Sequence, residues 1–228
     1  MPRTRIVASA CQLTTKPADG GSNATGAAAI GVHASHSASG SCRCAYWTGV
    51  PDVANPNSTS SNGTDSAIFR LTTQRANFGD VAVSFTLHNN GLSSTTTTPP
   101  VAWDGVHIFL HYQTEESLYY ASVNRRDGHV VIKKKCPGGP SNGGTYYELG
   151  PGEIANHPIP FGTNQNVGAT VADNSDGSVT LTLSLGGTKI VSATDTGVGC
   201  SPITQPGKVG IRGDNDNFTF SGFTVSSV

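Results

Sequence analysis

Hydrophobic and polar residues alternate in short runs along most of the chain after Asp65. A period of two places successive side chains on opposite faces of a β-strand, and clusters of Gly, Pro, Asn and Asp separate the runs. The predicted strands cover residues 67–72, 81–88, 106–113, 118–125, 129–135, 166–173, 179–185, 188–195, 208–212 and 218–225. Because no segment keeps a helical period over several turns, the pattern predicts an all-β protein.

The breakers between these runs favour antiparallel pairing. Asp-Gly or Gly-Gly pairs occur at 127–128, 176–177 and 186–187, and such pairs suit tight hairpin turns. About ten strands without intervening helices predict a two-sheet antiparallel jelly-roll sandwich of the concanavalin-A-like type.

The beginning of the chain has a different pattern. Residues 1–45 contain much Ala, Ser and Gly and almost no alternation, and residues 46–64 are rich in the Pro, Asn, Ser and Gly typical of loops. We therefore expect an irregular N-terminal segment with a loop at 1–64 and one sandwich domain at 65–228.

Composition and charge narrow the function classes. The 228 residues include 28 Gly and 13 Pro but only 13% charged residues, which excludes a charge-rich helical bundle. The net charge of −1 supplies no field for attracting nucleic acid. The longest apolar runs are far shorter than the roughly 20 residues that cross a bilayer. We expect no nucleic-acid or membrane partner, and a monomer.

The cysteines indicate a disulfide and an extracellular location. Five cysteines are an odd number, so at least one is outside any internal bridge. Cys136 and Cys200 each follow a strand-like run in a Gly/Pro-rich loop, and we predict that they form a disulfide bond. Together with the low charge and abundant Ser, Thr and Asn, this pairing predicts a secreted protein.

Three stretches resemble a known group of domains. They are 103–110 (WDGVHIFL), 118–128 (LYYASVNRRDG) and 207–215 (GKVGIRGDN), the last followed by Phe218-Thr219-Phe220. This region, roughly 65–225, resembles the concanavalin-A-like or laminin-G-like jelly rolls of secreted bacterial carbohydrate-active proteins. The resemblance implies this fold and a polysaccharide or oligosaccharide partner. It does not imply one activity, because that superfamily includes lectins, hydrolases, lyases and binding modules.

Strand alternation predicts one polar and aromatic sheet face. In 106–113, Val106, Ile108, Leu110 and Tyr112 are expected to face the core, and His107, Phe109, His111 and Gln113 to face outward. In the next strand, Tyr120, Ser122 and Asn124 are expected to face outward beside them. Rings that stack on sugars and groups that bind hydroxyls are typical of a saccharide site. A solvated sheet face is the competing interpretation.

Several functions remain open for this face. As a binding site it would use Gln113, Ser122, Asn124, Arg125 and Trp103. As a uronate lyase it would use His107 or His111 as the base, Tyr120 as the acid, and Asn124, Gln113 or an Arg to neutralise the substrate carboxylate. A two-carboxylate hydrolase is disfavoured because no strand carries acidic residues at alternate positions. A third possibility is an adhesion or structural sandwich without a glycan site.

Metal and charge motifs are few. Asp214 and Asp216 supply hard oxygen ligands just before the last strand, where jelly rolls of the resembling kind often hold a structural calcium ion. An Asx-rich turn is an equally good interpretation, and no cofactor is expected to be required. Lys133, Lys134 and Lys135 are predicted to form a charged strand end or to protect a sheet edge, and the alternative is that they help to hold an acidic polysaccharide.

Overall fold

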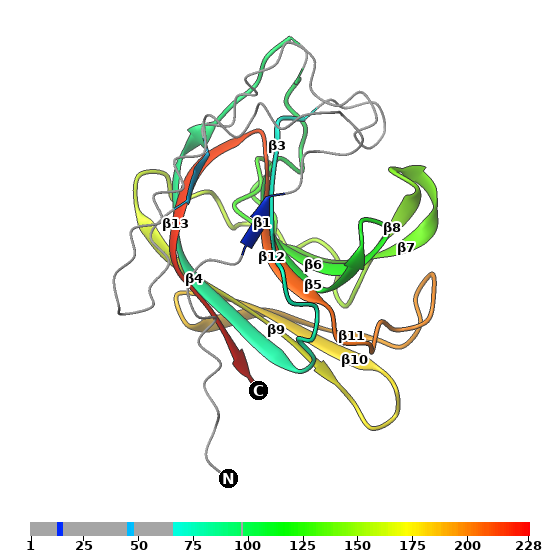
Figure 1. The fold of residues 1–228 in the computed structure, drawn as a ribbon. Helices are drawn as coiled ribbons and strands as arrows, with labels where there is room; N and C mark the ends of the chain where they lie inside the picture. The colour runs from blue at the N-terminus through cyan, green and yellow to red at the C-terminus, as the bar shows by residue number, and fades with distance from the viewer. Residues whose placement is uncertain (1–12, 16–44, 48–65, 97) are drawn as a thin grey trace.

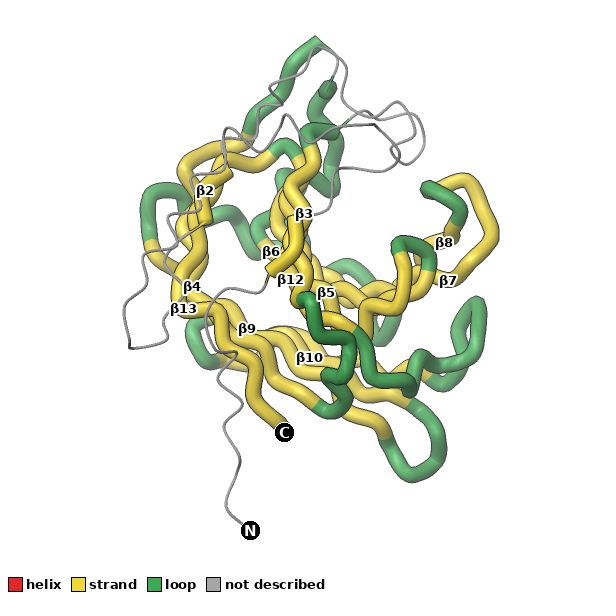
Figure 2. The backbone as a smooth tube through the Cα atoms, in the orientation of Figure 1, coloured by secondary structure: helices red, strands yellow, loops and turns green. Residues whose placement is uncertain are grey.

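A computed structural model of the protein describes residues 13–15, 45–47, 66–96 and 98–228. The described residues form thirteen β-strands and no helix (Figure 2). These strands make two antiparallel sheets packed as a sandwich (Figure 1). The described part also lacks any helix with the length and hydrophobicity needed to cross a membrane.

One sheet has seven strands, in the order β1-β3-β12-β5-β6-β7-β8. Its strands are β1 (Leu13–Thr15), β3 (Ile68–Thr73), β12 (Lys208–Asp214), β5 (Gly105–Thr114), β6 (Ser117–Val123), β7 (Val131–Ser141) and β8 (Gly144–Glu148). The hairpin β7–β8 curves away from the rest of the sheet (Figure 1). This sheet carries the candidate site.

The other sheet has six strands, in the order β11-β10-β9-β4-β13-β2. Its strands are β11 (Thr188–Asp195), β10 (Val179–Leu185), β9 (Asn164–Asp173), β4 (Val81–Leu92), β13 (Asp216–Ser227) and β2 (Ala45–Trp47). The chain passes from the seven-stranded sheet to this one between β12 and β13, at Asn215.

The core lies between the sheets and is built from alternate positions of the strands. In β5 these positions are Val106, Ile108 and Leu110, and in β10 they are Val179, Leu181 and Leu183, all of them fully buried. Burying one such aliphatic side chain contributes about 1.5–3 kcal/mol. The residues between them in sequence therefore face outward.

The predicted disulfide bond is confirmed. Cys136 and Cys200 are bonded, with their Cα atoms 6.0 Å apart. The bond ties the loop 196–207 to β7, and a buried ion pair reinforces it. The Nζ atom of Lys134 lies 2.7 Å from Asp195, and it donates to the carbonyl of Cys200 at 2.6 Å.

The predicted fold class is confirmed, but the structure differs from the predicted strands in several details. The structure adds β1, β2 and β8 to the predicted strands. Lys134 does not protect an edge, because β7 lies between β6 and β8 and Lys134 faces the interior. The predicted irregular structure of 1–64 falls, apart from β1 and β2, outside the described residues, so the boundary near residue 65 stays a prediction.

Candidate functional site

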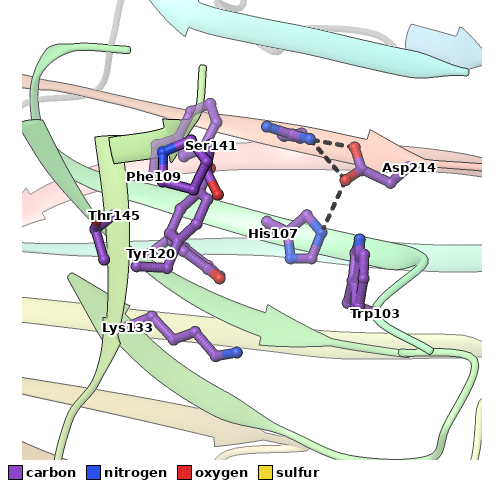
Figure 3. Close-up of a pocket in the computed structure, with 11 residues that line it drawn as sticks. Trp103, His107, Phe109, Tyr120, Lys133, Ser141, Thr145 and Asp214 are labelled. Carbon is purple, nitrogen blue, oxygen red and sulfur yellow. Dashed lines mark hydrogen bonds and ion pairs between the residues drawn. The ribbon is translucent and has the colours of Figure 1, made fainter. Parts of the chain in front are cut away.

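A pocket of about 290 Å³ opens on the outer face of the seven-stranded sheet (Figure 3). Side chains of β12, β5, β6, β7 and β8 line it, together with one residue of the loop before β5. The lining residues are Trp103, His107, Phe109, Tyr120, Lys133, Pro140, Ser141, Thr145, Tyr146, Arg212 and Asp214. The pocket therefore combines aromatic rings, cations and one carboxylate on a single sheet face.

Strand register explains why these residues meet. His107 of β5 lies opposite Ser122 of β6 and Arg212 of β12. Tyr120 of β6 lies opposite Phe109 of β5 and Lys133 of β7. Residues directly opposite in an antiparallel pair share one face. The structure thus places His107, Tyr120 and Ser122 on the common outer face that alternation predicted.

A buried ion pair forms one wall of the pocket. Arg212 donates from Nε to Oδ1 of Asp214 at 2.7 Å and from an Nη to Oδ2 at 2.8 Å. Burial opposes ionisation of Asp214, but Arg212 and His107 more than compensate and hold its pKa well below the usual value. Asp214 is therefore a carboxylate at neutral pH, and Arg212 neutralises it.

Both ring nitrogens of His107 have protein partners. Nδ1 lies 2.7 Å from the hydroxyl oxygen of Ser122, and Nε2 lies 3.6 Å from Oδ2 of Asp214. Burial lowers the pKa of His107, and Asp214 offsets part of that shift. In the neutral ring Nδ1 accepts from Ser122 when Nε2 carries the proton, and that proton then faces Asp214. At 3.6 Å the contact between Nε2 and Asp214 is longer than a hydrogen bond, so only Nδ1 is hydrogen-bonded. The geometry suits a residue that positions Ser122 and Asp214, and the predicted role of base stays a prediction.

Aromatic rings form the floor of the pocket. The Tyr120 ring meets His107 and Tyr146 edge-on, with centroid distances of 5.4 and 5.3 Å. The ammonium group of Lys135 lies 5.0 Å from the centre of the Tyr146 ring. Burial raises the pKa of Tyr120 well above its usual value, so its hydroxyl stays protonated. Trp103, which is 37% exposed, lies at the mouth of the pocket.

Lys133 and Arg125 share a network of ion pairs next to the pocket. The Nζ atom of Lys133 lies 3.3 Å from both Glu148 and Glu153. Arg125 donates to Glu153 at 2.6 Å and also binds Asp127. Of these residues only Lys133 lines the pocket, so Arg125, predicted to bind substrate, instead supports the network behind it.

His111 does not share the outer face with His107, contrary to prediction. The pairing of β5 with β6 is irregular between Leu110 and Thr114, and His111 adopts a φ of 43°. This bulge reverses the alternation and turns His111 inward. Its ring is fully buried, with Nδ1 2.7 Å from the carbonyl oxygen of Ile203 and Nε2 3.1 Å from that of Gly79.

The same bulge changes the orientation of two more side chains relative to the prediction. Tyr112, expected in the core, packs with Phe109 and Leu118 in a separate cluster. Gln113, predicted to bind saccharide, donates from Nε2 to the carbonyl oxygen of Gln205 at 2.9 Å. Gln113 therefore holds the loop before β12 and does not line the pocket.

The outward orientation that strand alternation predicted for Asn124 is also wrong. It follows the end of β6 with a φ of 51°, and its buried side chain donates to Oδ1 of Asn89 at 2.7 Å. Its carbonyl oxygen approaches Gly105, where a Cβ atom would lie only 2.5 Å away. Glycine at 105 therefore permits the contact that fixes this turn, and Asn124 lies outside the pocket lining.

The two predicted calcium ligands lie in different surroundings. Both carboxylate oxygens of Asp214 bind Arg212. Asp216 is fully buried, and Nδ2 of Asn89 donates to its two oxygens at 2.7 and 2.6 Å. Calcium takes six to eight oxygen ligands, and a guanidinium group on one carboxylate does not fit such a shell. The structure does not bring the pair together as a calcium site.

Burial and the nearby carboxylates of Asp104 and Asp214 raise the pKa of Asp216 to about 8, although Asn89 acts in the opposite direction.

Within the described part of the chain, a different group of residues, Asp127, His129 and Glu153, offers ligand atoms within 4.8 Å of one another. Arg125 already pairs with both of these carboxylates, so a cation occupies the position that a metal would need.

Sequence reasoning missed part of the lining. Ser141 ends β7, which extends beyond the predicted strand 129–135. Thr145 and Tyr146 lie in β8, which was not predicted, although the run 144–148 carries strand-forming residues. The sequence placed Arg212 at the end of a strand and gave it no role in the site, because the adhesion-like tripeptide 212–214 (RGD) was attributed to chance. The spacing Arg212-x-Asp214 is the signal that places both side chains on one face.

Comparisons with known proteins agree on the fold. No model of a protein family matches the chain, and no curated protein matches its sequence. A Bacillus subtilis protein with a galectin-like fold matches with a TM-score of 0.50 and 14% identity, covering 73% of this chain and 80% of that one. A carbohydrate recognition domain of Emp46p matches with a TM-score of 0.52 and 10% identity, covering 95% and 89%. The chain therefore has a lectin-like β-sandwich fold.

Proposed function

We propose that this protein binds a saccharide in the pocket on the outer face of its seven-stranded sheet. The observation that carries the proposal is the combination of exposed Trp103 with Tyr120, Tyr146 and Lys133 around one cavity. Aromatic rings supply flat apolar surfaces for pyranose rings, and the polar groups fix orientation. A cavity near 290 Å³ suits a ligand the size of one or two sugar units.

The buried charges argue against a merely solvated face or a structural sandwich. Asp214 and Arg212 have side chains only 3% and 12% exposed, and His107 joins them. Removing charges from water is costly unless each is paired in good geometry. Such an arrangement on an outer sheet face needs a reason beyond solubility, and a preorganised ligand site supplies one.

Binding is better supported than either catalytic alternative. A hydrolase needs two carboxyl groups beside the scissile bond, and among the described residues the pocket lining contains only that of Asp214. For uronate elimination, the protonated Tyr120 is a suitable acid and Lys133 a suitable neutraliser. The candidate base, His107, is only 6% exposed and its Nδ1 already contacts Ser122, so a substrate has poor access to its ring.

Secretion fits this proposal. A disulfide bond persists in oxidising compartments outside the cytoplasm, and Cys136–Cys200 is such a bond. A saccharide-binding domain in that location meets polysaccharides directly. We therefore propose a secreted glycan-binding protein.

The test compares two exposed aromatic residues. Trp103→Ala removes the ring at the pocket mouth, and Phe161→Ala is a matched control, because Phe161 is 49% exposed and lies outside the lining. Calorimetric titration against neutral and acidic polysaccharides should show at least about tenfold weaker binding for Trp103→Ala only. Absence of binding to every polysaccharide, or equal losses in both variants, would contradict the proposal.

The same panel separates binding from cleavage. Incubation with each polysaccharide should leave chain length unchanged and produce no ultraviolet absorbance from unsaturated uronates. Release of reducing ends or growth of that absorbance, lost in Tyr120→Phe, would instead establish an enzyme acting at this pocket.

A further inference from the structure

Trp103 and Lys133 give the pocket hydrogen-bond donors that cannot also act as acceptors. Of the lining residues that the structure describes, only Asp214 carries a carboxylate, and Arg212 and His107 already lie against its oxygens. The indole of Trp103 and the ammonium group of Lys133 donate and never accept. The hydroxyl groups of Tyr120 and Ser141 can donate or accept, so a ligand that brings acceptors matches this lining best.

The two cations of the lining flank its rings. Arg212, His107, Tyr120 and Lys133 lie on four successive strands, β12, β5, β6 and β7. Three strand spacings amount to roughly 14 Å, and the edge-on ring pair of His107 and Tyr120 lies between the cations. A saccharide that rests on these rings and runs across the strands passes close to both.

Lys133 is the cation that remains available. Arg212 is neutralised by Asp214 inside the lining. The partners of Lys133 lie outside the lining and are more exposed than it is, at 47% for Glu148 and 32% for Glu153 against 17%. Exposed ion pairs contribute little, and Glu153 is shared with Arg125. An ammonium group has three N–H donors, so one is left for a ligand.

Figure 3 shows the side chain of Lys133 extending toward the side of the pocket where Trp103 lies. An anionic group placed there meets a charge-assisted donor beside an aromatic ring. We infer that the pocket takes an acidic saccharide and that the ammonium group of Lys133 binds its anionic group, a carboxylate or a sulfate. This inference rests on the proposed saccharide binding and names the class of ligand.

The experiment uses two pairs of ligands that differ in charge. Polygalacturonate is compared with its methyl ester, and dextran sulfate with dextran, by calorimetric titration of the full chain. At least one acidic member should bind about tenfold or more tightly than its neutral partner. Its affinity should fall as salt is added, because screening weakens accessible charge pairs. The acidic member that binds identifies the anionic group.

Three variants locate the contact. Lys133→Gln should reduce the affinity for the acidic ligand to that for its neutral partner, and Lys133→Arg should retain most of it. Lys189→Gln is the control, because it removes the same charge from an exposed position on β11, in the other sheet. Circular dichroism verifies that each variant is folded.

The outcomes separate this inference from the function on which it rests. If no saccharide of either charge binds, the proposed function is wrong. If saccharides bind but neutral and acidic partners bind equally, saccharide binding stands and the acidic specificity is overturned. If Lys133→Gln and Lys189→Gln weaken acidic binding to the same extent, the attraction is nonspecific and Lys133 is not the contact.

Discussion

The outer faces of the two sheets differ, although the same alternation of residues builds both. The seven-stranded sheet presents His107, Tyr120, Lys133 and Arg212 around a pocket. The six-stranded sheet presents mainly hydroxyl and amide side chains, among them Ser84, Thr86, Asn166, Thr170, Thr180, Thr182, Ser192, Thr194, Thr219 and Thr224. These hydroxyls bind one another, as in the 2.6 Å contact between Thr170 and Thr182. A polar sheet face is therefore not by itself a site.

The contrast extends to two aspartates where the chain crosses between sheets. Asp214 ends β12 beside Arg212 and keeps its charge. Asp216 begins β13 with an amide as its hydrogen-bond partner, and its pKa rises to about 8. The same side chain thus has opposite pKa shifts two residues apart, because only one of the two is paired with a cation.

A substitution in the core between the two sheets should have the largest effect on stability. Ile108→Ala removes a fully buried side chain and should lower the free energy of unfolding by roughly 2–5 kcal/mol. Urea unfolding measures the loss, and saccharide affinity of the remaining folded protein should be nearly unchanged. A silent Ile108→Ala together with an unfolded Tyr120→Ala would mean that the two faces of β5 and β6 are assigned the wrong way round.

The aspartate contrast predicts an unusual pH dependence. A carboxyl group with a raised pKa in the folded state favours folding below its unfolded pKa near 4, and this stability is lost as pH rises to about 8. Asp216→Asn should therefore match the parent at pH 4 and exceed it by a few kcal/mol at pH 8.5. Unfolding at several pH values checks this, and equal curves for the two proteins would show that Asp216 ionises normally.

The ring at the pocket should affect binding more than folding. Tyr120→Ala removes a ring that is only partly buried, and we expect about tenfold weaker saccharide binding with a smaller loss of stability than Ile108→Ala causes. Calorimetry and urea unfolding of the same preparation separate the two effects. Unchanged affinity in the folded variant would remove Tyr120 from the site.

A substitution on the outer face of the six-stranded sheet should have the smallest effect on stability and on saccharide binding. Thr182→Ala deletes one half-buried cross-strand contact on the outer face, so stability should change by no more than about 0.5 kcal/mol and saccharide affinity should not change. The same assays apply. A loss of affinity comparable to that of Tyr120→Ala would place a binding surface on the six-stranded sheet as well.

Local pattern was sufficient for much of this protein. Alternation of apolar and polar residues, broken by Gly, Pro, Asn and Asp, determined the all-β class and most strands. Matched positions beside strand ends determined the pairing of Cys136 with Cys200. The same alternation placed His107, Tyr120 and Ser122 on one face, because strand periodicity is local and holds wherever pairing is regular.

Tertiary contacts decided the rest. His111 leaves the face of His107 because a bulge in β5 reverses the alternation, and its ring then binds two carbonyl groups far away in sequence. Asn124 turns away through a left-handed backbone that meets Asn89. The ionisation of Asp214 and Asp216 depends on which partners the fold brings to each. Period and spacing do not encode a register shift or a partner from a distant strand, so only the folded chain determined which polar residues line the pocket.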